Sequence, residues 1–477
     1  MPVAIHCRPT LSRAILGSGG GGGGSIYLGL TPTIYAAPAD VGSGNGSSEA
    51  NAMDLATALT TVTAGGIVGL IPGVYSRQSP GGENRFAVAW NPANSGSSGN
   101  PIRIVAKYPA ATTVDTGNWS EMRADLITTY GSPAFGSDGR DYIEWYGVYG
   151  SDESGHSASA DDTSVCVLHS ADHCVIKYCV IRGDGAKWGA NNYHGITCED
   201  CVNPTASYND ISNYYTGSVG AVNANGCGIM LDHSGGGLVE RNYIHDCGAG
   251  VFHKRSDASG GGAYTHGNWI VRYNKIIDCE FGVRGDSNQS SGQTTWTFDV
   301  YQNLMVGCEY ACYNGNSSND LSGDVRFVNN TLVNCTVAHA TNQQPYDATA
   351  GHKFYNNVVY DPAQVYNWDN WSSGELATLS TAEFLANYNV YYSAATFFDG
   401  DAIAAQTLGT WQGLGQDANA ITTDPLFTNT AGGIYTLQAG SPARNLGIDI
   451  LDLQGGGTSA SIHAGCYVTG TETIGIA

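Results

Sequence analysis

A repeat of about 30 residues constrains the fold of this chain more than any other feature. Four phrases share one pattern, an asparagine followed five residues later by a cysteine, and they begin at Asn242, Asn274, Asn303 and Asn330. The register extends, in steps of similar length, back to Asn209, Cys179 and Gly147 and forward to Asn357 and Asn389. Such a sustained period is typical of a solenoid, in which each repeat packs only against its neighbours.

Each repeat contains three short strand-like runs separated by polar turns. In residues 269–286 these runs are WIVRY, KIIDC and EFGVRGD, and they show no helical periodicity of apolar residues. Strands of this length stack on the next repeat about 4.8 Å away and direct alternate side chains into one core. The sequence therefore predicts an all-β, single-stranded parallel β-helix. We expect the recurrent asparagine itself to turn the corner in a left-handed backbone, with its amide bonded to the next coil.

These phrases resemble the right-handed parallel β-helix superfamily of pectate-lyase-like proteins, which includes polysaccharide lyases, some glycoside hydrolases and phage tailspikes. The resemblance covers about residues 34–470 and is supported at both ends of that range. SSEANAMDLATALTTV resembles the helix that caps the first coil, with Ser48 as N-cap and Leu55, Leu59 and Val62 on its buried face. The TDPLF and GSPA phrases near the C-terminus resemble a closing segment. The resemblance implies a right-handed coil with an N-terminal capping helix.

A glycine-rich run, GSGGGGGGS, separates a short basic head from the body and suggests an extended N-terminal arm. We divide the chain into four parts: an attachment arm with its linker (1–33), the N-terminal cap and first coils (34–110), the β-helix core (111–395), and the last coils with the C-terminal cap (396–477). Arg8, Pro9 and Arg13 interrupt the apolar stretch that a secretory signal needs, so we expect no cleaved signal.

The charge and cysteine content limit the partners. A formal charge of −22 repels phosphate backbones, and the apolar runs are far too short to span a bilayer, so we expect neither nucleic acid nor a membrane as partner. The repeated cysteines Cys247, Cys279, Cys308 and Cys335 share one register position and should stack inside as free thiols. Cys198 and Cys201 have a metal-like spacing without a second such pair, which argues against zinc. Reduced thiols fit assembly in a cytoplasm.

One face of the coils collects the residues that could carry chemistry. After each corner, a small residue is followed by an alternating strand whose second and fourth side chains should point outward. The second-position column is Thr197, Met230, Phe252, Arg284, Tyr313 and Ala340. The fourth-position column is Glu199, Asp232, Lys254, Asp286, Gly315 and Asn342, with His233 and Arg255 at the strand ends. The inward His253 and His339 are expected to be core residues.

Three interpretations of this face remain open. In a polysaccharide lyase, Glu199, Asp232 and Asp286 would hold Ca²⁺, Lys254 would be the base and Arg284 would clamp a uronate carboxylate, with His233 beside Asp232. Phe252, Tyr313 and Arg255 would bind the sugar. A glycoside hydrolase would use Asp232 and Asp286, but Lys254 between them would lower both pKa values and impair the general acid. The third interpretation is a charge-alternating ladder without chemistry.

The arm and the fold together suggest a virion-associated phage tail or head appendage, assembled in the host cytoplasm, that binds surface polysaccharide, with degradation of that polysaccharide left open. Residues 1–33 would contact other virion proteins, and the shaft would form a homotrimer, as the resemblance implies. The alternatives are a secreted extracellular lyase that acts on uronate-containing glycans and a purely structural decoration protein. No cofactor other than Ca²⁺ is expected.

Overall fold

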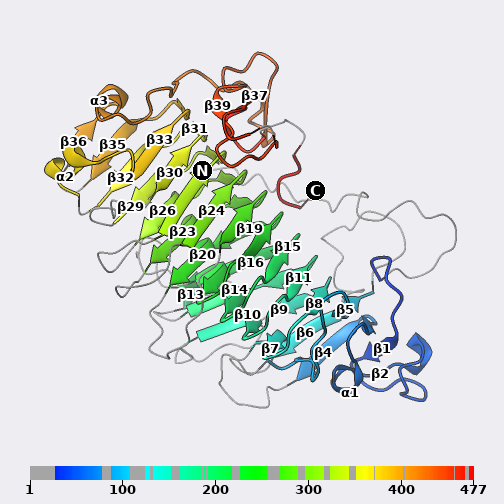
Figure 1. The fold of residues 1–477 in the computed structure, drawn as a ribbon. Coiled ribbons are helices and arrows are strands. Elements are labelled where there is room, and N and C mark those ends of the chain that lie inside the picture. Colours follow the sequence, from blue (N-terminus) through cyan, green and yellow to red (C-terminus); the bar gives the residue numbers. More distant parts are fainter. Residues whose placement is uncertain are drawn as a thin grey trace. The chain divides into compact units, whose positions relative to one another are not determined.

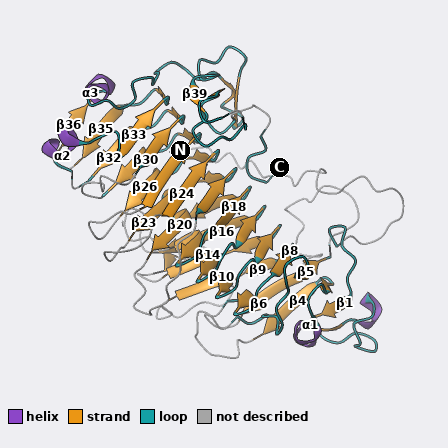
Figure 2. Cartoon of the chain, viewed as in Figure 1, coloured by secondary structure: helices purple, strands orange, loops and turns teal. Residues whose placement is uncertain are grey.

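The fold is described from a computed structural model of the 477-residue chain. The structure describes residues 27–77, 88–107, 124–128, 133–151, 162–183, 187–188, 192–216, 226–255, 268–287, 296–315, 323–342, 351–369, 371–400, 403–455, 457–467 and 472–476. The expected arm lies largely outside these residues. The described chain forms two units, which meet in sequence near residue 218 and are described separately. Figure 1 shows strands stacked in parallel within each unit, and Figure 2 shows how few helices accompany them.

In both units the strands follow one another around three faces of a coil, here named faces 1, 2 and 3 in chain order. In unit 1, face 1 contains β2 (Met53–Asp54), β1 (Ile34–Ala37), β3 (Ile67–Leu70), β5 (Ile102–Ala106), β8 (Ile143–Tyr146), β11 (Val175–Lys177) and β15 (Thr205–Ser207). Face 2 contains β4 (Gly73–Arg77), β6 (Ala124–Thr128), β9 (Tyr149–Ser151), β12 (Val180–Arg182) and β16 (Asp210–Thr216), with β13 (Lys187–Trp188) paired to β16. Face 3 contains β7 (Phe135–Asp138), β10 (Asp162–His169) and β14 (Asn192–Glu199).

Unit 2 repeats this order. Its face 1 contains β18 (Gly237–Glu240), β21 (Trp269–Arg272), β24 (Trp296–Tyr301), β27 (Gly323–Val328), β30 (His352–Tyr355) and β33 (Phe384–Asn387). Face 2 contains β19 (Tyr243–Cys247), β22 (Lys275–Ile277), β25 (Leu304–Val306), β28 (Thr331–Val333), β31 (Val358–Tyr360) and β34 (Val390–Tyr392). Face 3 contains β17 (Gly226–Asp232), β20 (Ala249–Arg255), β23 (Phe281–Ser287), β26 (Tyr310–Gly315), β29 (Val337–Thr341), β32 (Gln364–Trp368) and β35 (Thr396–Gly400), and ends with the antiparallel β36 (Ile403–Gln406). The predicted parallel β-helix is confirmed.

The recurrent asparagines form a buried ladder at the corner between faces 1 and 2. In unit 2, each side-chain amide donates to the Oδ1 atom of the next asparagine, at 2.9 Å from Asn242 to Asn274 and 3.0 Å from Asn274 to Asn303. The same Oδ1 atoms accept the backbone N–H of the preceding asparagine. The ladder thus satisfies polar groups that would otherwise be buried unpaired.

The expectation that these asparagines turn the chain themselves is wrong. The positive φ angles belong to the preceding residues, for example Tyr273 at 57° and Gln302 at 54°. The asparagine follows the bend with its side chain directed inward and fully buried. Its amide forms the bonds along the ladder, and the residue before it adopts the unfavourable left-handed backbone.

The repeated cysteines are buried free thiols, as predicted. Burial raises the pKa of Cys279 well above its ordinary value, and the neighbouring Cys247 thiol adds to that rise. The inward histidines are also core residues. The His253 ring stacks on Phe298 at 4.9 Å between centroids, and burial lowers the pKa of His339 to about 3. Cys279 and His339 therefore pack as neutral side chains.

The N-terminal cap is shorter than predicted. Helix α1 spans Leu55–Thr61, and its N-cap is Asp54, whose side chain accepts a hydrogen bond from Thr57 N at 3.0 Å. Ser48 instead precedes the short 3-10 helix η2 (Glu49–Asn51) and caps nothing with its side chain. The reason is that Met53 and Asp54 pair with β1, which interrupts helical geometry between the two elements. Leu55, Leu59 and Val62 are buried as expected.

The C-terminal part of unit 2 covers the coils from outside. After α2 (Ser373–Thr378) and α3 (Leu408–Gly413), the chain forms two hairpins, β37 (Phe427–Asn429) with β38 (Ile434–Leu437) and β39 (Gly447–Ile448) with β40 (Ser461–Ile462). Phe427 and Tyr435 pack with Val333 and Val358 on the outside of face 2. No helix that the structure describes is both long enough and apolar enough to cross a membrane.

The asparagine ladder ends at a buried aspartate. Asn389 donates to Asp417 Oδ1 at 2.8 Å, and Asp417 Oδ2 accepts from the Tyr391 hydroxyl at 2.8 Å and from Trp411 Nε1 at 2.9 Å. The Tyr366 hydroxyl lies 3.1 Å from the same oxygen. Asp417 follows Asn389 by one repeat period, so it occupies the next position of the ladder. It is the acceptor on which the ladder terminates.

Asp417 should make the stability of unit 2 depend on pH. Burial raises the pKa of Asp417 to about 6, although its hydrogen bonds oppose that shift. Because the folded-state pKa lies above the ordinary value of 3.8, the folded state binds the proton more tightly than the unfolded chain. The contribution to the free energy of unfolding is therefore full below about pH 4 and is lost as the pH rises through 6, a change of about 3 kcal/mol. Denaturant unfolding should show this slope in the wild type and lose it in Asp417→Asn; equal slopes would contradict the assignment.

Candidate functional site

Face 3 of unit 2 carries the two predicted outward columns in the expected register. Met230 pairs with Phe252, Phe252 with Arg284, Arg284 with Tyr313, and Tyr313 with Ala340. Asp232 pairs with Lys254, Lys254 with Asp286, and Asp286 with Gly315. The parallel stacking thus places a carboxylate residue, a lysine and a second carboxylate residue at the same position of three successive strands.

Lys254 lies between two carboxylate positions and forms no ion pair with any described residue. Its side chain is half-buried, and within the described part of the chain it forms neither a hydrogen bond nor a salt bridge. Its charge nevertheless acts on a buried thiol. Burial raises the pKa of Cys227, and the charges of Lys254 and Arg284 partly oppose that rise. An ammonium group held in this position remains available for a ligand.

The outside of face 1 shows what a structural charge ladder looks like in this fold. Three pairs of oppositely charged residues, each in register on neighbouring strands, form close ion pairs. They are Arg103 with Glu144 at 2.7 Å, Arg272 with Glu240 at 2.9 Å, and Arg326 with Asp299 at 2.5 Å. Such cross-strand pairs contribute a few tenths of a kcal/mol each. Lys254 and Asp232 occupy the same register relation without forming the pair, so a stabilising ladder does not account for them.

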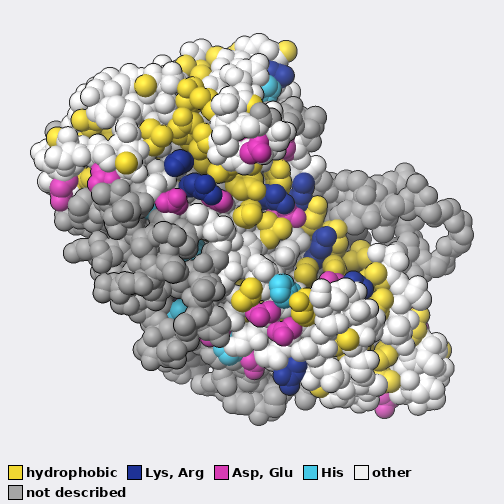
Figure 3. Space-filling model, viewed as in Figure 1, with side chains coloured by type: hydrophobic (Ala, Val, Ile, Leu, Met, Phe, Trp, Pro, Cys, Tyr) yellow, Lys and Arg dark blue, Asp and Glu magenta, His cyan; other side chains and the backbone are white. Residues whose placement is uncertain are grey.

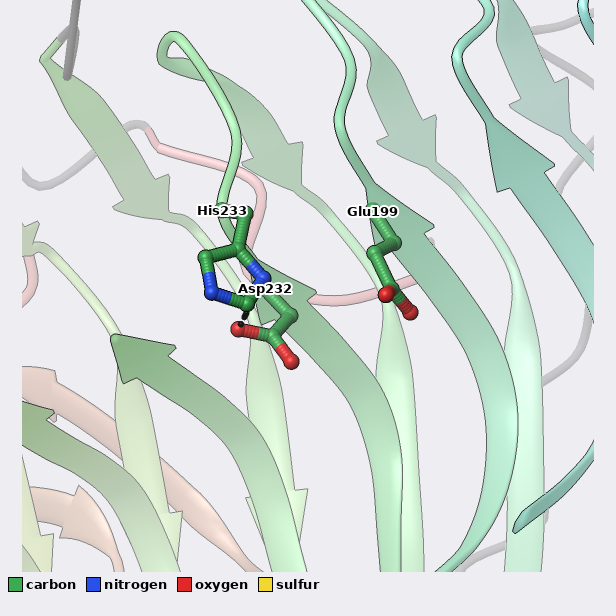
Figure 4. Close-up of side chains that lie close together, drawn as sticks. All are labelled: Glu199, Asp232 and His233. Atoms are coloured by element: carbon green, nitrogen blue, oxygen red, sulfur yellow. Dashed lines mark ion pairs between the residues drawn. The ribbon is translucent and has the colours of Figure 1, made fainter. Parts of the chain in front are cut away.

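Asp232 and His233 lie together at the end of β17. His233 Nδ1 is 3.2 Å from Asp232 Oδ1, and Figure 4 shows the imidazole lying against the carboxylate. His233 has a φ of 46°, so the chain bends there, and the His233 side chain lies against that of Asp232. Asp232 is 8% exposed and His233 is half-buried. The pair provides a carboxylate and a group that can carry a proton.

Arg284 is held among aromatic rings next to Lys254. Its guanidinium carbon lies 4.4 Å from the centroid of the Phe252 ring, 5.1 Å from Phe281 and 5.5 Å from Tyr313. These stacking contacts fix the plane of the guanidinium. Phe252 and Tyr313 are 1% and 5% exposed, so in this conformation their rings serve Arg284 and the surrounding cluster and offer no free face to a sugar.

Two predicted site residues, Arg255 and Asp286, are described only in part. The backbones of Arg255 and Asp286 are placed by their pairing, whereas their side chains lie outside the described residues. Glu199 belongs to unit 1, where it ends β14 and is 5% exposed. Its predicted share in a metal site with Asp232 and Asp286 therefore stays a prediction.

Unit 1 contains a polar group that the sequence reasoning missed. His169 pairs in register with Asp138 and Glu199 on face 3, and its Nδ1 atom lies 2.8 Å from Asp138 Oδ1. Its Nε2 atom lies 3.8 Å from Asp200 Oδ2. Asp138, His169 and Glu199 recur at the repeat period, so extending the fourth-position column backwards from Glu199 would have found the other two.

Comparison with solved structures finds the same parallel β-helix fold in a pectate lyase. Pectate lyase Pel9A matches with a TM-score of 0.56 at 14% identity, over 92% of this chain and 97% of that one. XylC, solved with xylose, matches with a TM-score of 0.44 at 12% identity, over 83% and 87% of the chains. A mannuronic acid specific family 6 lyase from human gut microbiota matches with a TM-score of 0.42 at 11% identity, over 78% of each chain. No family model and no curated sequence matches. At these identities the likeness shows the fold alone.

Proposed function

We propose that this protein is a polysaccharide lyase that binds uronate-containing glycans across face 3 of unit 2, with Lys254 as its base. The observation that carries the proposal is the ammonium of Lys254, which lies between two carboxylate positions on in-register strands and is unpaired within the described chain. On face 1, by contrast, opposite charges in the same register relation form ion pairs. The fold match to a structure described as a pectate lyase supports the substrate class.

The residues divide the elimination reaction between them. Arg284 would receive the uronate carboxylate, which makes the proton on the adjacent carbon C5 more acidic. Lys254 would take that proton after its ammonium group has released one to solvent. The electron pair of the broken C–H bond then forms the C4–C5 double bond, and the C4–O bond to the neighbouring sugar breaks. His233 in its protonated form, held by Asp232, would donate a proton to the departing oxygen.

The direct test uses the product. The purified full-length chain should be incubated with polygalacturonate and with alginate while ultraviolet absorbance of the unsaturated product is followed. Absorbance that rises with one of these substrates supports the proposal. New reducing ends without that absorbance would identify a hydrolase, and no cleavage of either polymer would remove the proposed activity.

Calcium has a defined place in this proposal. Carboxylate oxygens are the ligands that Ca²⁺ prefers, and Asp232, with Glu199 and Asp286 as predicted partners, would supply them. The ion would neutralise the uronate carboxylate together with Arg284. We expect EDTA to reduce cleavage by about tenfold or more and added Ca²⁺ to restore it. Cleavage that is unchanged by EDTA would leave Arg284 as the group that binds the carboxylate.

A virion-associated role is a finer proposal that rests on the sequence. The arm that would contact other virion proteins, residues 1–33, is described only from residue 27 onward, and a trimeric assembly likewise stays a prediction. The glycine-rich linker supports attachment to a larger particle. Mass spectrometry of purified particles should find peptides of the intact N-terminus. Finding the chain only as a free extracellular protein that begins near Asp40 would instead favour the secreted lyase.

A further inference from the structure

The corner between faces 1 and 2 of unit 1 carries a row of tyrosines. Tyr178 and Tyr208 occupy the same position on successive coils, just before the ladder position, and Tyr146 lies one position earlier on the preceding coil, in register with Lys177. Their ring centroids are 6.5 Å apart from Tyr146 to Tyr178 and 5.2 Å apart from Tyr178 to Tyr208. All three side chains are half-buried. The row therefore presents one partly exposed ring per coil.

A lysine lies over this row. Lys177 Nζ is 4.9 Å from the centroid of the Tyr178 ring and 5.0 Å from that of Tyr208. Like that of Lys254, the side chain of Lys177 forms no hydrogen bond or ion pair within the described chain, although the protein has 42 acidic and only 20 basic residues. Figure 3 shows basic side chains lying beside hydrophobic ones over β8, β11 and β15. This cation is thus able to attract an anionic group.

The tyrosines are costly residues for this corner. Tyr178 and Tyr208 have φ angles of 58° and 56°, and a bulky residue is rarely found in that region. The same corner position in unit 2 is occupied by Asn329 and Asn356, which tolerate a positive φ well, and by two further tyrosines, Tyr273 and Tyr388. Local backbone preference therefore does not explain the tyrosines at this corner in either unit, and contacts made by the rings do.

Unit 2 shows that this corner can hold an extended chain. Asn329 Nδ2 donates to His463 O at 2.9 Å, and Asn356 Nδ2 donates to Ile448 O at 2.7 Å. Further along, Arg241 Nη1 donates to Thr473 O at 2.9 Å. In unit 2, polar side chains at the corner thus bind the protein's own C-terminal segment. Tyr273 lies at this corner too, with the Arg241 guanidinium 4.6 Å from its ring, and its carbonyl oxygen accepts from Gly475 N. In unit 1, Tyr178, Tyr208 and Lys177 likewise combine aromatic rings and a cation, which suit a saccharide with acidic groups.

We infer that Tyr146, Tyr178, Tyr208 and Lys177 form a second glycan-binding site, one that holds an acidic polysaccharide along the corner of unit 1. Sugar rings would lie against the tyrosines, one for about each coil, and Lys177 would pair with a carboxylate or sulfate of the glycan. The inference rests on the proposed function for the nature of the ligand, and it adds a site that takes no part in cleavage.

The test measures binding without cleavage. In a Lys254→Ala background, affinity electrophoresis should be run in gels that contain polygalacturonate or neutral hydroxyethyl cellulose. Lys177→Glu should weaken retention by polygalacturonate about tenfold, while Lys353→Glu, which makes the same charge change on face 1 of unit 2, should alter it less than about twofold. The double variant Tyr178→Ala, Tyr208→Ala should weaken retention by polygalacturonate by about the same factor as Lys177→Glu. Circular dichroism should show that this variant is folded.

Each outcome distinguishes this inference from the proposed function. Retention that is unchanged in both the lysine and the tyrosine variants overturns the second site, while cleavage by the wild type still supports the lyase. Equal loss in Lys177→Glu and Lys353→Glu overturns it as well, because net charge alone would then explain the effect. If the tyrosine variants lose retention by the neutral polymer and Lys177→Glu does not change retention by polygalacturonate, the inference that the ligand is acidic is overturned.

Discussion

Lys254→Ala should abolish the release of unsaturated sugar, with a fall in kcat of about 10³-fold on whichever uronate polymer the protein cleaves. The reason is that Lys254 is the only candidate base in the described part of face 3 that lies between the two carboxylate positions. Lys254→Arg keeps the charge but supplies no base at neutral pH, so it should be as inactive as alanine while KM changes little. The measurement is the initial rate of ultraviolet absorbance at saturating substrate.

Lys353→Ala is the matched control for this result, because Lys353 is also half-buried and the only hydrogen bond of its side chain within the described chain goes to Gly351 O. It should retain wild-type activity. If Lys254→Ala kept even a third of the wild-type rate, the base would have to be another residue. If Lys254→Arg were active, Lys254 would act through its charge and not through proton transfer.

The second large effect is expected in the asparagine ladder. Asn303→Ala should lower the free energy of unfolding by about 3 to 5 kcal/mol, since several buried polar groups lose their partners at once. Asn303 Nδ2 donates to Val271 O at 2.9 Å and to Asn330 Oδ1 at 3.1 Å. Its own Oδ1 accepts both N–H groups of Asn274 at 3.0 Å. Urea unfolding monitored by circular dichroism measures the change.

Asn419→Ala provides the comparison for the ladder variant. Asn419 is exposed, and its backbone N–H donates to Asn387 Oδ1 at 2.9 Å, a bond that alanine retains. The substitution should change the free energy of unfolding by less than about 0.5 kcal/mol. Equal destabilisation by the two variants would mean that the ladder contributes no more than an ordinary surface amide.

The repeat made most of the fold predictable, because a regular period determines which residues stack on successive coils. The register of Asp232, Lys254 and Asp286 followed from that period and is confirmed. The left-handed backbone was assigned one residue too late, since asparagine suits both the bend and the ladder and the sequence does not separate these roles. The N-cap was misplaced for a similar reason: Ser48 and Asp54 both precede helical residues, and strand pairing of Met53 and Asp54 decided between them.

The environment of the site was less predictable than its register. Alternation along β20 and β26 indicated that Phe252 and Tyr313 face outward, and it carried no information on how deeply they are buried. Likewise, contacts such as that of Asn356 with Ile448 join residues 92 positions apart, far outside the repeat period. The absence of an ion pair at Lys254 within the described chain also depends on side-chain conformation, which a periodic pattern does not encode.

A crystal structure of the Lys254→Ala variant soaked with a uronate oligosaccharide that the wild type cleaves tests the central claim most directly. The account predicts sugar density across β17, β20 and β23, with a uronate carboxylate at Arg284 and C5 facing the space that the lysine side chain vacates. A bound oligosaccharide found only elsewhere on the protein, with face 3 of unit 2 empty, would contradict it.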